Sequence, residues 1–275
     1  MTRECSDTRV RVRATLAILA SLSLLAGVSG ARAEGDYVTS RYTNSGFSAL
    51  KDLSSKLFDN LADKDKKQIS PLVCLLETNK IPVIKPEPIQ LNGRTGSEVI
   101  VSTGCIDLIN RVAHAKAIDD VRPGYFDRYV ATLGDNAGDV KELPDIADDK
   151  CWTEDVLNEQ VSYFNQMVGI LVALNLSHQY LGHCAKYSAQ LSTASTDTAF
   201  INDFVTSSEW DKSMKAATTD SMGCALGTQG YSLLLDAFGK MNRRPVWADH
   251  FVPKKEDLAK VKKRFAGYEK DFFNQ

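Results

Sequence analysis

Hydrophobic residues recur at the three- to four-residue spacing of amphipathic helices over most of this chain. The spacing predicts helices over residues 47–61, 106–117, 157–189, 209–225, 232–241 and 254–273. The third of these is the longest and most apolar, which indicates a buried central helix. Only residues 98–103 (EVIVST) read as a good strand. Residues 80–88 alternate prolines with β-branched residues and predict an extended edge strand or connector, because proline cannot donate to a sheet ladder. The balance predicts an α+β fold that is mostly helical with a small sheet.

The N-terminus has the three parts of a secretory signal peptide. Four arginines precede an apolar run, Ala14–Val28, and the small residues Ser29–Ala33 follow it. We expect cleavage after Ala33 and a mature protein in the periplasm or outside the cell. The run is shorter than the roughly 20 residues of a membrane-spanning helix, although an uncleaved N-terminal anchor is the alternative. No later segment is apolar enough to span a membrane. Residues 34–69 form a helical lead-in and 70–275 the main domain, with an insertion at about 119–150.

Charge and cysteine content narrow the possible partners and folds. The chain has 33 basic and 35 acidic residues, of which the first 33 residues hold five and two, so the mature net charge is about −5. This mild acidity argues against a nucleic-acid partner, which favours a clustered basic surface. Five cysteines remain after cleavage: Cys74, Cys105, Cys151, Cys184 and Cys224. An exported location permits disulfides, and the odd number leaves one thiol unpaired unless a second chain supplies a partner.

Two histidines on the apolar central segment are the first candidates for chemistry. His178 and His183 are five residues apart, which places them about 140° apart on a regular α-helix. The zinc motif HExxH uses a spacing of four, so a straight helix would not direct both rings at one ion. A π-bulge could restore a common face. The alternative is a structural pair that is simply hydrogen-bonded.

Four segments, taken in order, resemble the gluzincin zinc metallopeptidases of the HtpX, BepA, Oma-type and CAAX-prenyl-protease family. Residues 98–109 resemble the family's edge strand and following helix. Leu181-Gly182-His183 matches the end of its HELGH motif. Residues 220–231 and 247–258 are similar to its later helix and its closing His-Pro segment, where His250 would lie near the cleft. The resemblance covers about residues 70–265 and implies a gluzincin-like fold, a zinc ion, and envelope proteins or peptides as substrates.

The same resemblance shows departures from the family pattern. Gln179 and Tyr180 stand where the family has its first histidine and its catalytic glutamate, and Ala216 stands where it has the third ligand. A rebuilt site would need His178, His183 and an acid, for which we predict Asp220, with Glu209 as the other possibility. The family's two active-site helices lie side by side, which suggests a Cys184–Cys224 disulfide or thiolate site. Two separate buried thiols are the alternative.

Two functions remain open at this point. One is an exported metallopeptidase-like protein with a degenerate or rearranged zinc site. The other is a non-catalytic relative that binds a protein or peptide in the periplasm. A peptidase needs convergent ligands and an acidic base in one cleft, whereas a binding protein should show an exposed apolar groove. His114, by contrast, reads as a residue on a helix surface.

Overall fold

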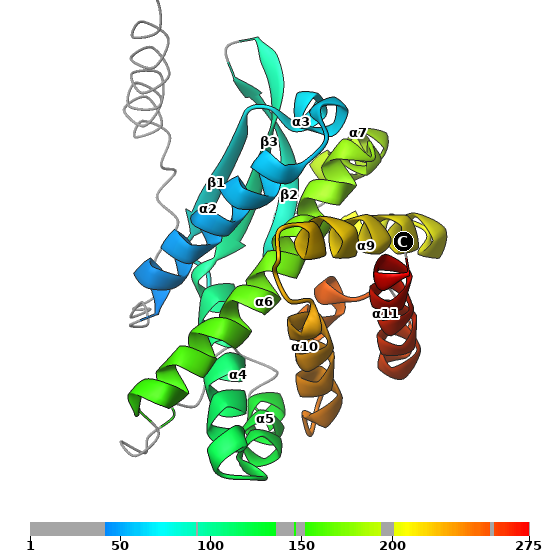
Figure 1. Ribbon diagram of the computed structural model, residues 1–275. Helices are drawn as coiled ribbons and strands as arrows, with labels where there is room; N and C mark the ends of the chain where they lie inside the picture. The colour runs from blue at the N-terminus through cyan, green and yellow to red at the C-terminus, as the bar shows by residue number, and fades with distance from the viewer. Residues whose placement is uncertain are drawn as a thin grey trace, which may run out of the picture. The chain divides into compact units, whose positions relative to one another are not determined.

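Helix α6 (Glu154–Tyr180) runs through the middle of the molecule, with the sheet on one side and α9 and α10 on the other (Figure 1). The computed structural model describes residues 42–91, 93–135, 146, 152–193, 201–253 and 256–274, all within the unit Thr39–Gln275. Every residue from Met167 to Tyr180 is buried, and α2, α4, α9, α10 and β2 all pack against α6. The near-continuous apolar sequence of the segment is therefore that of a helix buried on all sides.

The sheet has three strands in the order β1-β3-β2. β1 (Leu72–Glu77) pairs parallel with β3 (Arg94–Ser102), and β2 (Ile84–Leu91) pairs antiparallel with it. The predicted strand forms the centre of the sheet, where Val99 and Val101 are fully buried. The proline-rich segment forms an edge strand, as predicted.

The backbone nitrogens of the two prolines in β2 point away from β3. The Ser102 amide donates to the Val83 carbonyl, so the pair 83/102 is hydrogen-bonded. Bonded and non-bonded pairs alternate along an antiparallel ladder. Pro86 opposite Val99 and Pro88 opposite Ser97 therefore fall on non-bonded positions. The outer edge of β2 lacks N–H donors at both residues, and this discourages pairing with another strand.

Helices and the turns between them make up the rest of the described chain. They are α2 (Thr43–Asn60), α3 (Asp63–Ile69), α4 (Thr103–Val121), α5 (Tyr125–Asp135), α7 (His183–Lys186), α8 (Ser188–Thr193), α9 (Ser207–Gly223), α10 (Gln229–Lys240) and α11 (Leu258–Phe273), with 3₁₀ turns η3 (Ile201–Asp203) and η4 (Val246–Phe251). α10 approaches α6 so closely that a Cβ added at Gly230 would lie 2.4 Å from the Met167 backbone nitrogen. The α+β prediction is confirmed.

One sequence prediction about this fold is wrong, and one segment is more helical than its composition suggested. Within the expected insertion at about 119–150, α4 continues to Val121 and α5 begins at Tyr125. The acidic and glycine-rich composition hid the amphipathic pattern of α5. His114 is fully buried rather than on a helix surface, with its ring against Trp152 and its Nδ1 atom 3.3 Å from the Tyr42 hydroxyl.

The cysteines of the described residues, Cys74, Cys105, Cys184 and Cys224, are free thiols. The suggested Cys184–Cys224 disulfide is therefore wrong, and the alternative of separate buried thiols is the one observed. The Cys224 thiol instead donates to the carbonyl of Lys56 on α2, at 3.6 Å. Cys151 and the proposed signal peptide lie outside the described residues. None of the described helices combines the length and the apolarity needed to cross a membrane.

Candidate functional site

A break in the central helix brings the two candidate histidines together. α6 ends at Tyr180, and Gly182 adopts a left-handed conformation with φ of +80°. Glycine adopts this conformation without steric cost. His183 then begins the short helix α7, so its side chain returns toward His178. The continuous helix predicted over 157–189 is wrong at this point. The five-residue spacing is bridged by a helix end rather than by a π-bulge.

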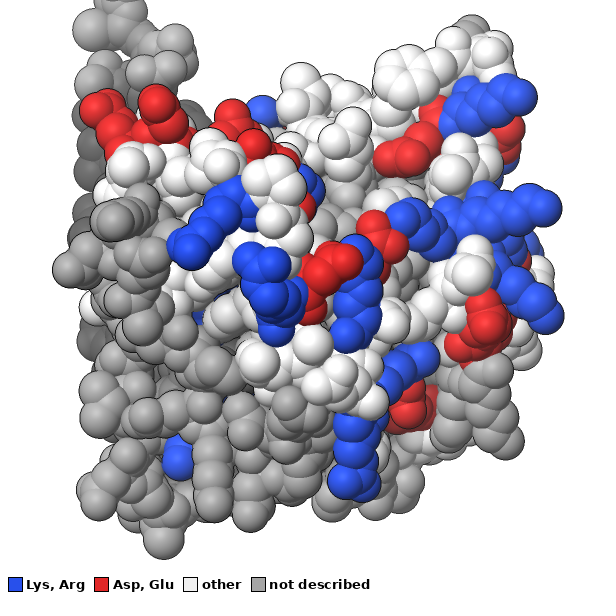
Figure 2. All heavy atoms as spheres, turned by 90° about the horizontal axis from the view of Figure 1, so that it is seen from below, with Lys and Arg blue, Asp and Glu red and all other residues white. Residues whose placement is uncertain are grey.

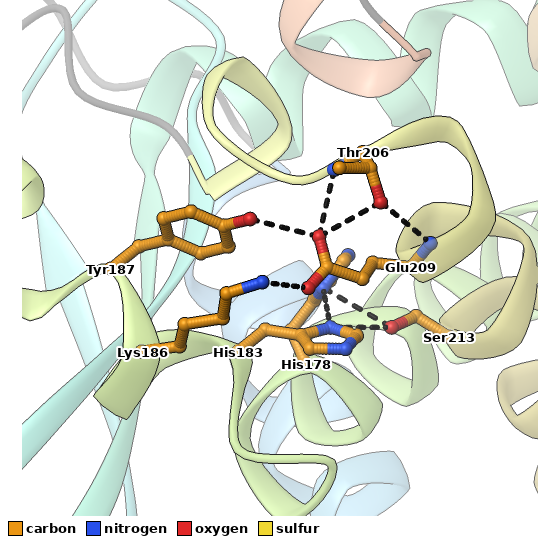
Figure 3. Close-up of polar contacts among 7 residues, drawn as sticks. All are labelled: His178, His183, Lys186, Tyr187, Thr206, Glu209 and Ser213. Carbon is orange, nitrogen blue, oxygen red and sulfur yellow. Dashed lines mark hydrogen bonds and ion pairs between the residues drawn. The ribbon is translucent and has the colours of Figure 1, made fainter.

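His178, His183 and Ser213 form a closed triangle of polar contacts (Figure 3). The Nδ1 atoms of the two histidines lie 3.0 Å apart. The Ser213 hydroxyl oxygen, from α9, lies 3.2 Å from the first and 3.1 Å from the second. All three residues are buried, with exposed fractions of 1%, 7% and 0%. Ser213 was not recognised from the sequence, because a single serine within a polar helix gives no signal.

Burial keeps both rings neutral. Desolvation, the largest cause, and the neighbouring His183 together lower the pKa of His178 to about 3, against a hydrogen bond with Asn202 and the charge of Glu209, which both raise it. Desolvation also lowers the pKa of His183. Between two facing nitrogens, one must carry the hydrogen and the other must accept it. A second proton would place two charges against each other in a buried site.

Glu209, the alternative acid, is engaged in a different set of bonds beside the triangle (Figure 3). Its carboxylate accepts hydrogen bonds from Lys186 at 2.6 Å and Tyr187 at 2.9 Å. It also accepts the Thr206 backbone N–H and completes a capping box at the start of α9. The bond with Lys186 is the main cause that lowers the pKa of Glu209 to about 2. The bond with Lys186 joins α7 to α9. The Thr206-x-x-Glu209 spacing is a sequence signal for the capping box alone.

Asp220 is placed at a different part of the α6–α9 contact. It lies seven residues, or about two turns, after Ser213 on α9. Its carboxylate accepts a hydrogen bond of 2.7 Å from the Tyr180 hydroxyl. Burial raises the pKa of Asp220 to about 6, and the bond from Tyr180 lowers it in part. The structure thus brings His178 and His183 together and bonds Asp220 to Tyr180 instead.

The donor atoms of this site do not fit a catalytic zinc ion. Such an ion needs about three protein ligands drawn from His, Cys, Asp and Glu. Within the described part of the chain, no group of three such side chains is placed to hold a metal. A serine hydroxyl occupies the third corner, and the nearby carboxylate of Glu209 is already bonded to Lys186, Tyr187 and Thr206. No chemical step through zinc follows from this arrangement.

A small cavity is lined in part by His178. It has a volume of about 20 Å³ and lies between β2, α6, η3 and η4. Its polar wall residues are Lys85, Asn175, His178, Asn202 and His250. His250 thus lies beside the cavity. Asn175, Asn202 and Lys85 were not singled out in the sequence, because they come from three distant segments.

A larger and more open hollow, of about 560 Å³, lies between α10 and α11. Charged residues of both signs line it: Asp236, Lys240, Arg244, Glu256, Asp257 and Lys262. Figure 2 shows that acidic and basic side chains lie beside one another over much of the face seen from below. This hollow is not the apolar groove expected of a peptide-binding protein.

Comparisons with models of protein families, with curated proteins and with solved structures find no match to this chain.

Proposed function

We propose that this protein is an exported, non-catalytic relative of the gluzincin zinc metallopeptidases, which binds a protein or peptide of the cell envelope instead of cleaving it. The closed triangle of His178, His183 and Ser213 carries the non-catalytic part of the proposal, whereas the binding of a protein or peptide rests on the family resemblance alone. Its two histidine nitrogens are hydrogen-bonded within the protein and buried. No third ligand or acidic base joins them among the described residues.

The cavity-facing side of α6 supports the same proposal. Leu174, Asn175 and His178 all line the cavity. In an HExxH motif the two histidines are four residues apart and the glutamate follows the first. Residues 174, 175 and 178 have these relative positions, and they place leucine at the first ligand and asparagine at the base. This register differs from the one that matches His183 to the motif, yet both registers lack the glutamate.

Export and the kind of partner are the parts of the proposal that rest on the sequence. The arginine-rich start and the apolar run of residues 14–28 support a cleaved signal peptide. The family resemblance supports envelope proteins or peptides as partners. Mass spectrometry of the protein recovered from the periplasm tests export, with a mature start at Glu34 as the expected result. A protein retained in the cytoplasm with its first 33 residues would contradict it.

A second candidate function, a divergent metallopeptidase, is favoured by one specific observation. Two imidazole nitrogens 3.0 Å apart could rearrange into two ligands of one ion. This site would use His178, His183 and an acid such as Asp220, brought in by movement along the α6–α9 contact.

Metal content and proteolysis together test both candidates. The mature protein is incubated with excess zinc, freed of unbound metal and analysed by elemental mass spectrometry. It is also assayed on an unstructured protein substrate with zinc present. We expect far less than one zinc per chain and no cleavage. About one zinc per chain, lost in His178→Ala and His183→Ala, together with cleavage would establish the peptidase. Asp220→Asn reports whether the predicted third ligand takes part.

A further inference from the structure

The two outer edges of the sheet differ in their chemistry. β2 presents Pro86 and Pro88, whose missing N–H groups discourage pairing with another strand. β1, the other edge strand, contains no proline, and its only charged residue is Glu77 at the end. Among the described residues, β1 pairs with β3 alone. β1 therefore lacks the features that usually protect an edge strand.

The backbone of β1 directs three residues away from the sheet. The Ser97 N–H donates to the Pro71 carbonyl, which fixes the phase of the ladder between β1 and β3. The N–H and C=O groups of one residue in a strand point to the same edge, and those of the next residue point to the opposite edge. Val73 and Leu75 therefore bond to β3. The residues that point outward are Leu72, Cys74 and Leu76.

The side chains along β1 suit an apolar partner strand. Leu75 is 42% exposed, and the other side chains of the strand are half-buried. Because side chains alternate along a strand, Val73 and Leu75 lie on one face of the sheet and Cys74 lies on the other. An added strand would cover Leu75 and place its own side chains opposite those of β1. The edge therefore offers main-chain hydrogen bonds together with an exposed apolar side chain.

A second copy of this chain fits this edge poorly. α2 packs against β1, with Ser54 and Lys51 near Cys74. Burial raises the pKa of the Cys74 thiol, whereas a hydrogen bond with Ser54 and the charge of Lys51 lower it. Antiparallel pairing of two β1 strands about Cys74 would keep both α2 helices on one face of the joined sheet. It would also bring the exposed Lys51 of each copy toward the other, and like charges repel. An extended segment without such a helix avoids both conflicts.

Chain direction and charge define the partner segment further. An antiparallel ladder is slightly more stable per residue than a parallel one. In an antiparallel ladder the partner residue opposite Cys74 lies on the face of the sheet that α2 and Lys51 occupy. An acidic side chain at this position would be attracted by the Lys51 ammonium group.

We infer that the outer edge of β1 binds an extended, mostly apolar peptide segment as a fourth, antiparallel strand of the sheet, with an acidic side chain beside Lys51. The three outward residues of β1 supply the main-chain hydrogen bonds, and Leu75 and Lys51 supply the selectivity. The inference deepens the proposed function and rests on it, because it names the position at which the envelope protein or peptide binds. This edge is separate from β2, the strand that packs against α6.

Amide hydrogen exchange with a synthetic peptide tests the inference. The probe is acetyl-Val-Thr-Val-Asp-Val-Thr-Val-amide, with its aspartate intended to lie opposite Cys74. In the free mature protein, we expect the three outward N–H groups to exchange about tenfold faster than those of Val73 and Leu75. Bound probe should slow the outward groups by about tenfold. Slow exchange of these groups without the probe, or binding of the probe without their protection, would overturn the inference.

N-methylated probes separate strand pairing from other modes of binding. A methyl group on the aspartate nitrogen removes a donor that faces β1, whereas one on the preceding valine nitrogen points away from β1. We expect the first methyl group to weaken binding about tenfold more than the second. Replacement of the aspartate by lysine should weaken binding by about fivefold, because the Lys51 charge then repels the probe. Equal affinities of the two methylated probes would overturn the inference.

Variants of Cys74 test the protein side of the same contact. Cys74→Pro removes the central outward donor and leaves the bonds to β3 in place, as Pro86 and Pro88 do in β2. It should bind the probe about tenfold more weakly than Cys74→Ala, which retains the N–H group. Cooperative urea unfolding shows whether each variant is folded, and the methylated probes decide the question if Cys74→Pro is not. Equal binding by the two folded variants would overturn the inference. So would a failure of the wild type to bind the probe, whereas the proposed function is judged by the zinc and cleavage assays.

Discussion

The Tyr180 hydroxyl donates a hydrogen bond of 2.7 Å to the Asp220 carboxylate, across the contact between α6 and α9. Burial nevertheless raises the pKa of Asp220 to about 6. The bond compensates in part for the loss of water around the charge, and the protonated carboxyl is still favoured by folding. The residue predicted as a metal ligand is thus a half-buried acid with its own dependence on pH.

Replacement of Asp220 by asparagine should stabilise the protein at neutral pH. An acid whose pKa is raised by folding stabilises the fold fully below its unfolded-state value of about 4. That stability is lost as the pH rises through about 6. We expect Asp220→Asn to raise the free energy of unfolding by about 1–2 kcal/mol at pH 7.5, with less gain near pH 4. Urea denaturation at both pH values measures this. Tyr180→Phe is the control that removes the compensating bond, and it should destabilise the fold more at pH 7.5.

The histidine pair should make the fold less stable as the pH falls, which is the opposite of the effect of Asp220. A base whose pKa is lowered by folding stabilises the fold above its unfolded-state value of about 6.5. The contribution is lost as the pH falls toward about 3, the pKa of His178. We expect a loss of about 2 kcal/mol between pH 7.5 and 5. His178→Gln should flatten this slope while lowering stability overall. The comparison is made in the Asp220→Asn background, where the opposing acid is absent. An unchanged slope would contradict the assignment.

The site of Gly182 has room for a larger side chain, but its left-handed backbone conformation disfavours other residues. A Cβ at this position would meet no atom within 4 Å, so its cost comes only from the φ of +80°. We expect Gly182→Ala to lower the free energy of unfolding by about 1–2 kcal/mol. Gly182→Asn should cost less, because asparagine adopts the left-handed conformation more readily. Gly267→Ala is the matched control within α11, where open space and helical backbone should give a small gain. If Gly182→Ala leaves the free energy of unfolding unchanged, the helix break moves easily.

Pro88 should protect the outer edge of the sheet against self-association. It is exposed and lies on a position whose backbone faces away from β3. Pro88→Thr restores an outward N–H donor on a strand that already favours extended structure. We expect this variant to form larger species at high concentration in size-exclusion chromatography with light scattering. Gln90→Thr, at a similarly exposed position that already has its N–H, should stay unchanged. If both variants form species of the same size, Pro88 does not protect the sheet edge against self-association.

Local sequence determined several helices, two of the described strands and much of the core. The three- to four-residue spacing of apolar positions specified α2, α9, α10 and α11, because one face of each helix must be buried. The run around Val99–Val101 specified a buried strand, and the prolines at 86 and 88 specified an edge strand. These features depend on residues close together along the chain, so periodicity and backbone chemistry were sufficient.

The tertiary structure alone decided the site. Ser213 and Asn202 come from segments far from His178 in the chain, and nothing local indicates that they converge on it. The helix break at Gly182 depends on packing as well as sequence, since glycine permits a left-handed turn without requiring one. His114 is buried because Tyr42 and Trp152, each distant in sequence, cover it. Spacing along the chain fixes which face a residue occupies within one helix, but only the packing of helices decides what that face meets.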